Sequence, residues 1–183
     1  RKARCSGSRT NLAVLSRLGD CPDPLLSELP AFVEGYAAWA ARQKETLSGL
    51  SEDDGAAAER ICHRIETTVK RMRGGLALLG RDAQVRLAFA LANRAMLDQM
   101  RQHDAVQGKQ RGDDAHRWRP FQLAFLLTVL ESSADPDSED RDTVDLIWFP
   151  TGGGKTEAYL GLIAFQIALR RLRHPDTGGG TCV

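Results

Sequence analysis

The sequence predicts an α/β fold, in which an all-helical N-terminal region is followed by the opening of a parallel-sheet domain. Residues 1–107 carry apolar side chains at spacings of three and four, the period of amphipathic helices. Residues 144–149 form a short apolar run that is typical of a buried strand in a parallel sheet. A glycine-rich loop and a helical pattern over about residues 154–172 come next, and residues 180–183 would begin a second strand. Strand, loop, helix and strand in this order open a parallel-sheet domain.

Four helices are expected in the N-terminal region, over about residues 11–18, 30–47, 55–73 and from 82 onward. Ser51 and Asp82 are suitable N-caps for the third and fourth of these helices, and Pro30 suits the first turn of the second. The pair Gly74-Gly75 weakens or bends the third helix. Two apolar stripes indicate core packing: Ile61, Ile65, Val69 and Met72 in the third helix, and Val85, Phe89, Ala92, Met96 and Met100 in the fourth.

Composition changes after the fourth helix. A polar linker is followed by Arg119-Pro120, which opens a strongly apolar helix. Residues 132–142 are acidic and serine-rich and have the composition of a solvated loop. Trp118 and Trp148 are expected in the core. The predicted boundaries are 1–107 for the helical region, 108–118 for the linker and 119–183 for the beginning of the sheet domain.

Composition and charge limit the class of protein. With 183 residues, the chain accommodates one domain, or a small domain and part of another. Apolar residues make up 42% of it, enough for a hydrophobic core. Lysine and arginine number 25 against 24 aspartate and glutamate residues, so the net charge of +1 neither indicates nor excludes a nucleic-acid partner.

The cysteines and the apolar segments favour a cytoplasmic protein. Cysteines stand at positions 5, 21, 62 and 182, without metal-ligand spacing and too sparsely for a disulfide framework. No run approaches the roughly 20 apolar residues of a membrane span. The basic N-terminus has no apolar stretch behind it, so no secretion signal is indicated. We therefore expect reduced thiols and no membrane partner.

Residues 150–156 read Pro-Thr-Gly-Gly-Gly-Lys-Thr, which fits the phosphate-binding loop of a nucleoside triphosphatase. Glycines let backbone N–H groups approach phosphate oxygens closely at a helix N-terminus. Lys155 would reach the β- and γ-phosphates, and the Thr156 hydroxyl would ligate Mg²⁺, so these two residues are the predicted catalytic pair. The general consensus has glycine six residues before the lysine, where this chain has Phe149, so the match is partial. A glycine-rich turn without nucleotide is the alternative. The predicted phosphate-binding residues are Thr151, Gly152, Gly153, Gly154, Lys155 and Thr156, with Thr156 as the metal ligand.

This form of the loop resembles motif I of superfamily 2 helicases and translocases, which also lack the first glycine. Arg119-Pro120-Phe121-Gln122, which ends 33 positions before Lys155, resembles the Arg-Pro-aromatic-Gln element that lies upstream of motif I in that superfamily. The resemblance implies that residues 119–183 begin a RecA-like motor lobe that binds ATP with Mg²⁺. It also implies that Gln122 recognises adenine and that Phe121 stacks nearby. An ordinary surface glutamine on a helix is the alternative.

A closer resemblance is carried by residues 148–161, Trp-Phe-Pro-Thr-Gly-Gly-Gly-Lys-Thr-Glu-Ala-Tyr-Leu-Gly. Together with residues 121–125 and 88–96, this segment resembles the DrmA-type helicases of DISARM anti-phage defence systems. The resemblance spans roughly residues 30–183. That family implies a bacterial ATP-driven translocase that acts on DNA beside a partner subunit and a DNA methyltransferase.

Two functions stay open at this point. The first is the ATP-binding part of a DNA helicase or translocase, with DNA bound mainly by parts outside this chain. The alternative is a P-loop ATPase that acts as a regulatory switch without moving on nucleic acid. A third interpretation, compatible with the first, makes residues 1–107 a module that binds a partner protein, with the motor attached. Because the chain has no initiator Met, no acidic strand-end motif after Lys155 and no second lobe, we expect a segment that is inactive alone.

Overall fold

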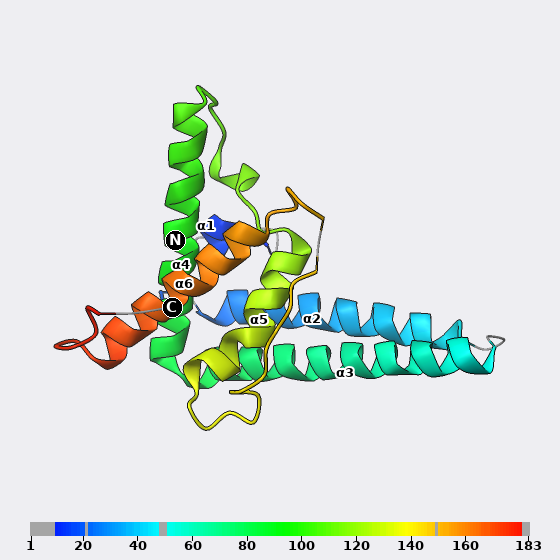
Figure 1. Ribbon diagram of the computed structural model, residues 1–183. Helices are drawn as coiled ribbons and strands as arrows, with labels where there is room; N and C mark the ends of the chain where they lie inside the picture. The colour runs from blue at the N-terminus through cyan, green and yellow to red at the C-terminus, as the bar shows by residue number, and fades with distance from the viewer. Residues whose placement is uncertain (1–9, 21, 48–50, 149, 181–183) are drawn as a thin grey trace.

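The computed structural model describes residues 10–20, 22–47, 51–148 and 150–180. Within these residues the chain is all-α, with six α-helices, one 3-10 turn and no sheet (Figure 1). The elements are α1 (Leu12–Leu15), α2 (Pro22–Glu45), α3 (Glu52–Arg81), α4 (Ala83–Val106), η1 (Asp113–Ala115), α5 (Pro120–Ala134) and α6 (Lys155–Arg173).

The predicted α/β fold is therefore wrong for the described part of the chain. Residues 143–148, where a buried strand was expected, have no regular secondary structure. Their apolar side chains Val144, Leu146 and Trp148 are 84–93% exposed, so the expected burial of Trp148 is also wrong. A strand needs a neighbour that pairs with its N–H and C=O groups, and no described segment forms a ladder with this one. Phe149 and most of the second expected strand, residues 181–183, lie outside the described residues.

The helices form a body and a long arm (Figure 1). Helices α2 and α3 run side by side in opposite directions and project from the body, and α4 runs across the base of this pair. Helix α5 packs on α3, and α6 packs across α4 and against α5. This arrangement places the first turns of α5 and α6 next to each other at one end of the body.

Helices on both sides of the predicted linker share one hydrophobic core. The fully buried side chains include Leu12, Phe89, Leu123, Leu127 and Phe165. The linker itself contains η1, and an isolated bridge joins Asn11 to Arg117. Trp118 is buried as expected, and its indole Nε1 donates a hydrogen bond to Asn93 Oδ1 at 2.7 Å. The domain boundaries stay predictions, because a shared core neither supports nor contradicts them.

Two glycines in α3 have a role other than the predicted weakening. The helix continues through Gly74 and Gly75 to Arg81. A Cβ at Gly75 would lie 2.3 Å from the carbonyl oxygen of Leu127 in α5. Glycine at this position therefore lets two helices approach closely, and the packing compensates for its low helix propensity.

Both predicted N-caps are confirmed. Ser51 accepts a hydrogen bond from the N–H of Asp54 at 3.2 Å, and Asp82 accepts one from the N–H of Gln84 at 2.8 Å. Pro30 lies inside α2, not in its first turn, because α2 begins earlier than expected. Ile61 is 57% exposed, so the first residue of the α3 stripe is not in the core.

Candidate nucleotide-binding loop

The glycine-rich loop is a tight turn that leads directly into α6. Gly152 and Gly154 have φ values of 75° and 90°, in the left-handed region that favours glycine. The N–H of Gly153 donates to the carbonyl of Pro150 at 3.1 Å and closes the turn. The loop therefore requires glycine at positions 152 and 154 for its backbone shape, independently of any ligand.

Lys155 and Thr156 are the first two residues of α6. Within the described part of the chain, no side chain caps the N-terminus of this 19-residue helix. Such a helix end carries partial positive charge and N–H groups that suit an anion. The Lys155 Nζ donates to the Pro150 carbonyl at 3.2 Å, so its ammonium group folds back along the loop. Thr151 and Thr156 are exposed. The structure thus brings together the predicted phosphate-binding residues.

Gln122 is joined to this loop although it lies on another helix. Its Nε2 donates to the Gly154 carbonyl at 2.7 Å, and its Oε1 accepts from the N–H of Arg119 at 2.7 Å. Gln122 is in the first turn of α5, where Pro120 is the first residue, and is only 3% exposed. The neighbouring Phe121 is partly buried. Two segments whose pairing was inferred from a resemblance are therefore in direct contact.

Two further contacts hold α6 in place, one against α5 and one against Trp118, which lies just before α5. The rings of Phe125 and Tyr159 meet edge to face, with their centroids 5.7 Å apart. Gly161 lies under Trp118, and a Cβ there would be 2.9 Å from the indole ring. The relative position of the two first turns is therefore set by close packing.

A residue that the sequence did not reveal holds the segment before the loop. Arg71 in α3 is 9% exposed, and its Nη1 and Nη2 donate to the two carboxylate oxygens of Asp145 at 2.6 and 2.7 Å. Its Nε lies 3.2 Å from Oδ2 of Asp140. The hydrogen bonds that Arg71 donates to Asp145 raise the pKa of its guanidinium. The only sequence signal was a charged residue, Asp145, within an apolar run.

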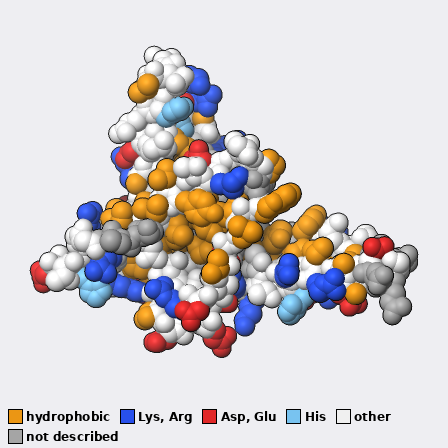
Figure 2. Space-filling view, viewed as in Figure 1, with side chains coloured by type: hydrophobic (Ala, Val, Ile, Leu, Met, Phe, Trp, Pro, Cys, Tyr) orange, Lys and Arg blue, Asp and Glu red, His pale blue; other side chains and the backbone are white. Residues whose placement is uncertain are grey.

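Exposed hydrophobic side chains gather around the middle of one face of the molecule (Figure 2). On the segment before the loop and on the first turns of α6, the exposed apolar residues are Val144, Leu146, Trp148, Tyr159 and Leu160. These side chains make the surface close to the candidate site more apolar than is expected of a solvated loop.

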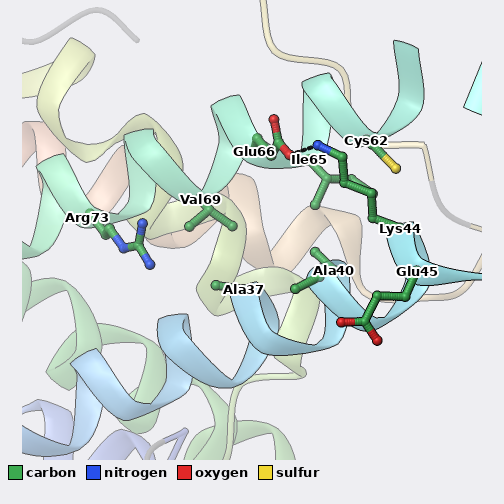
Figure 3. Close-up of a pocket in the computed structure, with 10 residues that line it drawn as sticks. Ala37, Ala40, Lys44, Glu45, Cys62, Ile65, Glu66, Val69 and Arg73 are labelled. Atoms are coloured by element: carbon green, nitrogen blue, oxygen red, sulfur yellow. Dashed lines mark hydrogen bonds and ion pairs between the residues drawn. The ribbon is translucent and has the colours of Figure 1, made fainter. Parts of the chain in front are cut away.

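A separate groove of about 470 Å³ lies between α2 and α3 (Figure 3). Small and branched apolar side chains line it, and an ion pair between Lys44 and Glu66, with Nζ and Oε1 2.9 Å apart, lies at its side. None of the predicted site residues lines this groove. It is therefore distinct from the candidate nucleotide-binding loop.

Two negative findings concern the described residues alone. Among them, no three His, Cys, Asp or Glu side chains are grouped so that they could hold a metal ion. No helix in the same ranges combines the length and the apolar composition that a membrane crossing requires.

The fold and the loop define an all-helical chain with a glycine-rich, uncapped helix start, and comparison with known proteins identifies a relative. The chain is 42% identical to the DISARM protein DrmA of Bacillus paralicheniformis over 129 residues, which cover 63% of this chain and 11% of that protein. The chain is therefore homologous to DrmA over this stretch, and the resemblance to DrmA is confirmed. It spans about a tenth of the length of this relative. No family model matches the chain.

Proposed function

We propose that the chain is the nucleotide-binding segment of a longer DrmA-like protein, an ATP-dependent helicase or translocase that acts on DNA in defence against phages. The observation that carries the proposal is the loop at residues 150–156. Left-handed glycines at 152 and 154 precede a helix whose first residues are Lys155 and Thr156. The homology to DrmA supports the defence role, and the unidentified partner subunit and the DNA contacts belong to this proposal.

The residues of the loop fit a triphosphate with its magnesium ion. The uncapped N-terminus of α6 supplies N–H groups and partial positive charge for phosphate oxygens. Lys155 now bonds to the backbone of Pro150 through a contact of 3.2 Å, which its long side chain can exchange for the β- and γ-phosphates. The exposed hydroxyl of Thr156 would ligate Mg²⁺. Every group needed to hold the phosphates therefore lies within seven residues.

Gln122 is proposed to recognise adenine, with Phe121 beside the base. A glutamine amide has two donor hydrogens and two acceptor lone pairs, and Gln122 uses one of each for Gly154 and Arg119. The remaining donor and acceptor match the edge of adenine that carries N6 and N7. Because the side chain is 3% exposed, this contact requires a local shift of the first turn of α5 or of the loop.

The test is ATP binding and hydrolysis by the full-length protein, with and without DNA. We expect hydrolysis that DNA stimulates and that Lys155→Ala reduces by about 10²-fold or more, because a donor to the transferring phosphoryl group is lost. Lys70→Ala, which removes an exposed lysine of α3, is the matched control and should leave hydrolysis unchanged.

ATP hydrolysis at the same rate with and without DNA would support a switch ATPase in place of a translocase. Wild-type hydrolysis in Lys155→Ala, or no binding of ATP by the unaltered protein, would exclude the assignment of the loop.

A further inference from the structure

We infer that Arg71 is a positioning residue for the nucleotide-binding loop, which it controls by fixing the segment through which the chain enters the loop. This inference rests on the proposed function and adds to it a residue of the arm, 84 positions before Lys155. The sequence places Arg71 in a helix with no motif, and no resemblance assigns it a role.

The contact between Arg71 and Asp145 is a bidentate ion pair that is largely buried. Both terminal nitrogens of Arg71 bond to separate oxygens of Asp145, at 2.6 and 2.7 Å. The Arg71 side chain is 9% exposed and that of Asp145 is 25% exposed. A planar fork of this kind fixes both distance and direction, which a single-point lysine contact does not.

The pair is the main polar attachment of the segment before the loop. Of the described residues 144–148, Asp145 is the one that has a side-chain hydrogen bond to the helices. Its neighbours Val144 and Leu146 are largely exposed and contribute little packing. Arg71 therefore determines where the chain runs before it reaches Pro150.

The loop is thus held at two ends by two buried polar side chains. Gln122 holds Gly154 at the exit, and Arg71 holds Asp145 at the entrance, nine residues earlier. Without Arg71, the nearest anchor to a helix on the entrance side is Arg141, whose Nη1 donates to the carbonyl of Ser132 in α5, 13 residues before Gly154. The entropic cost of ordering a loop grows as 3/2 RT ln n, so lengthening the free segment from 9 to 13 residues makes its ordering about 1.7-fold less favourable. Misplacement of the loop adds to this effect.

The experiment compares two arginines on the same helix of the full-length protein. Arg71→Ala should raise the KM and the Kd for ATP about twofold or more while kcat changes little, because the loop regains its shape once nucleotide is bound. Arg73→Ala is the matched control. Arg73 also makes a bidentate ion pair, with Glu34 at 2.7 and 2.8 Å, but this pair joins α3 to α2 and is exposed. This control should leave both constants unchanged.

Rescue separates positioning from general stability. Exchanging the partners, as Arg71→Asp with Asp145→Arg, together with Asp140→Asn, which removes the negative charge 3.2 Å from the Arg71 Nε, should restore most of the ATP affinity. If Arg71→Ala does not fold, Asp145→Ala removes the same contact from the more exposed side. Equal effects of Arg71→Ala and Arg73→Ala on the KM and Kd for ATP would overturn the inference. So would an Arg71→Ala variant that loses both kcat and thermal stability and whose ATP affinity the exchange of partners does not restore. If the unaltered protein does not bind ATP at all, the proposed function itself fails, and the two failures are therefore distinguishable.

Discussion

The side-chain amide of Gln122 donates a hydrogen bond to the carbonyl of Gly154 at 2.7 Å, so the first turn of α5 is joined to the residue that directly precedes α6. A change of position in either residue is therefore transmitted to the other. Nucleotide selectivity and loop shape should therefore depend on the same contact.

The full-length protein is expected to prefer ATP to GTP through Gln122. The amide can pair with the N6 donor and N7 acceptor of adenine, whereas guanine presents two acceptors on that edge. The preference should be about fivefold, the low end of the 1–3 kcal/mol that a two-bond contact provides. Competition binding should show the preference lost in Gln122→Ala. Gln166→Ala is the control, because Gln166 also donates to a backbone carbonyl, that of Ser133 in α5 at 2.9 Å. Equal affinities in the unaltered protein would leave Gln122 an ordinary structural residue.

Gly154→Ala should weaken ATP binding by about tenfold or more. An alanine at φ 90° is strained by ~1–2 kcal/mol, and its Cβ would lie 2.7 Å from Nε2 of Gln122. Gly179→Ala is the control, because no atom lies within 4 Å of a Cβ there. The measurement is the Kd for a fluorescent ATP analogue. Unchanged affinity in Gly154→Ala would mean that the loop does not use this backbone shape to bind nucleotide.

Two glycines of α3 should respond to alanine with opposite signs. Gly75→Ala places a Cβ 2.3 Å from a carbonyl oxygen of α5 and should lower the free energy of unfolding by ~1–3 kcal/mol. Gly80→Ala meets no atom within 4 Å and should raise it by ~0.5–1 kcal/mol through helix propensity. Thermal unfolding of the 183-residue chain, followed by circular dichroism, measures both. A stabilising Gly75→Ala would contradict the close approach of α3 and α5.

Asp82 should make stability depend on pH in the acid range. Burial raises the pKa of its carboxyl group, but hydrogen bonds from the N–H groups of Val85 and Gln84 and from Arg173 outweigh this and hold the pKa below its usual range. A lowered folded-state pKa means that the stabilisation is present above the unfolded value near 3.8 and is lost as the pH falls through the folded value. Asp82→Asn should therefore show a shallower loss of stability below about pH 4. Asp176→Asn, in an exposed turn, should follow the unaltered chain.

Local sequence patterns predicted the local features of this chain. The caps at Ser51 and Asp82 were predictable because the side chain and the N–H group that it accepts from are two or three residues apart. The glycine-rich loop was predictable for the same reason, since its shape is set by consecutive residues.

Features that depend on distant partners were not predictable. The apolar run at residues 144–149 has the composition of a strand, but pairing needs a neighbour that composition does not reveal. Gly75 was interpreted as a weak point because its contact, Leu127, lies 52 positions away. Arg71 and Asp145 are 74 positions apart, and neither belongs to a motif. In each case the missing information was which segments of the chain lie beside each other.

The three tryptophans occupy three different surroundings, and each can serve as an optical reporter of one part of the molecule. Trp39 stacks on Tyr36 in the arm and is 42% exposed, Trp118 is 2% exposed in the core, and Trp148 is 90% exposed before the loop. Indole emission shifts to longer wavelength in contact with water, so intrinsic fluorescence is the sum of three distinct bands. Replacing two tryptophans by phenylalanine leaves a single indole, and a denaturant titration of each such variant would show whether arm and core melt together or as separate units.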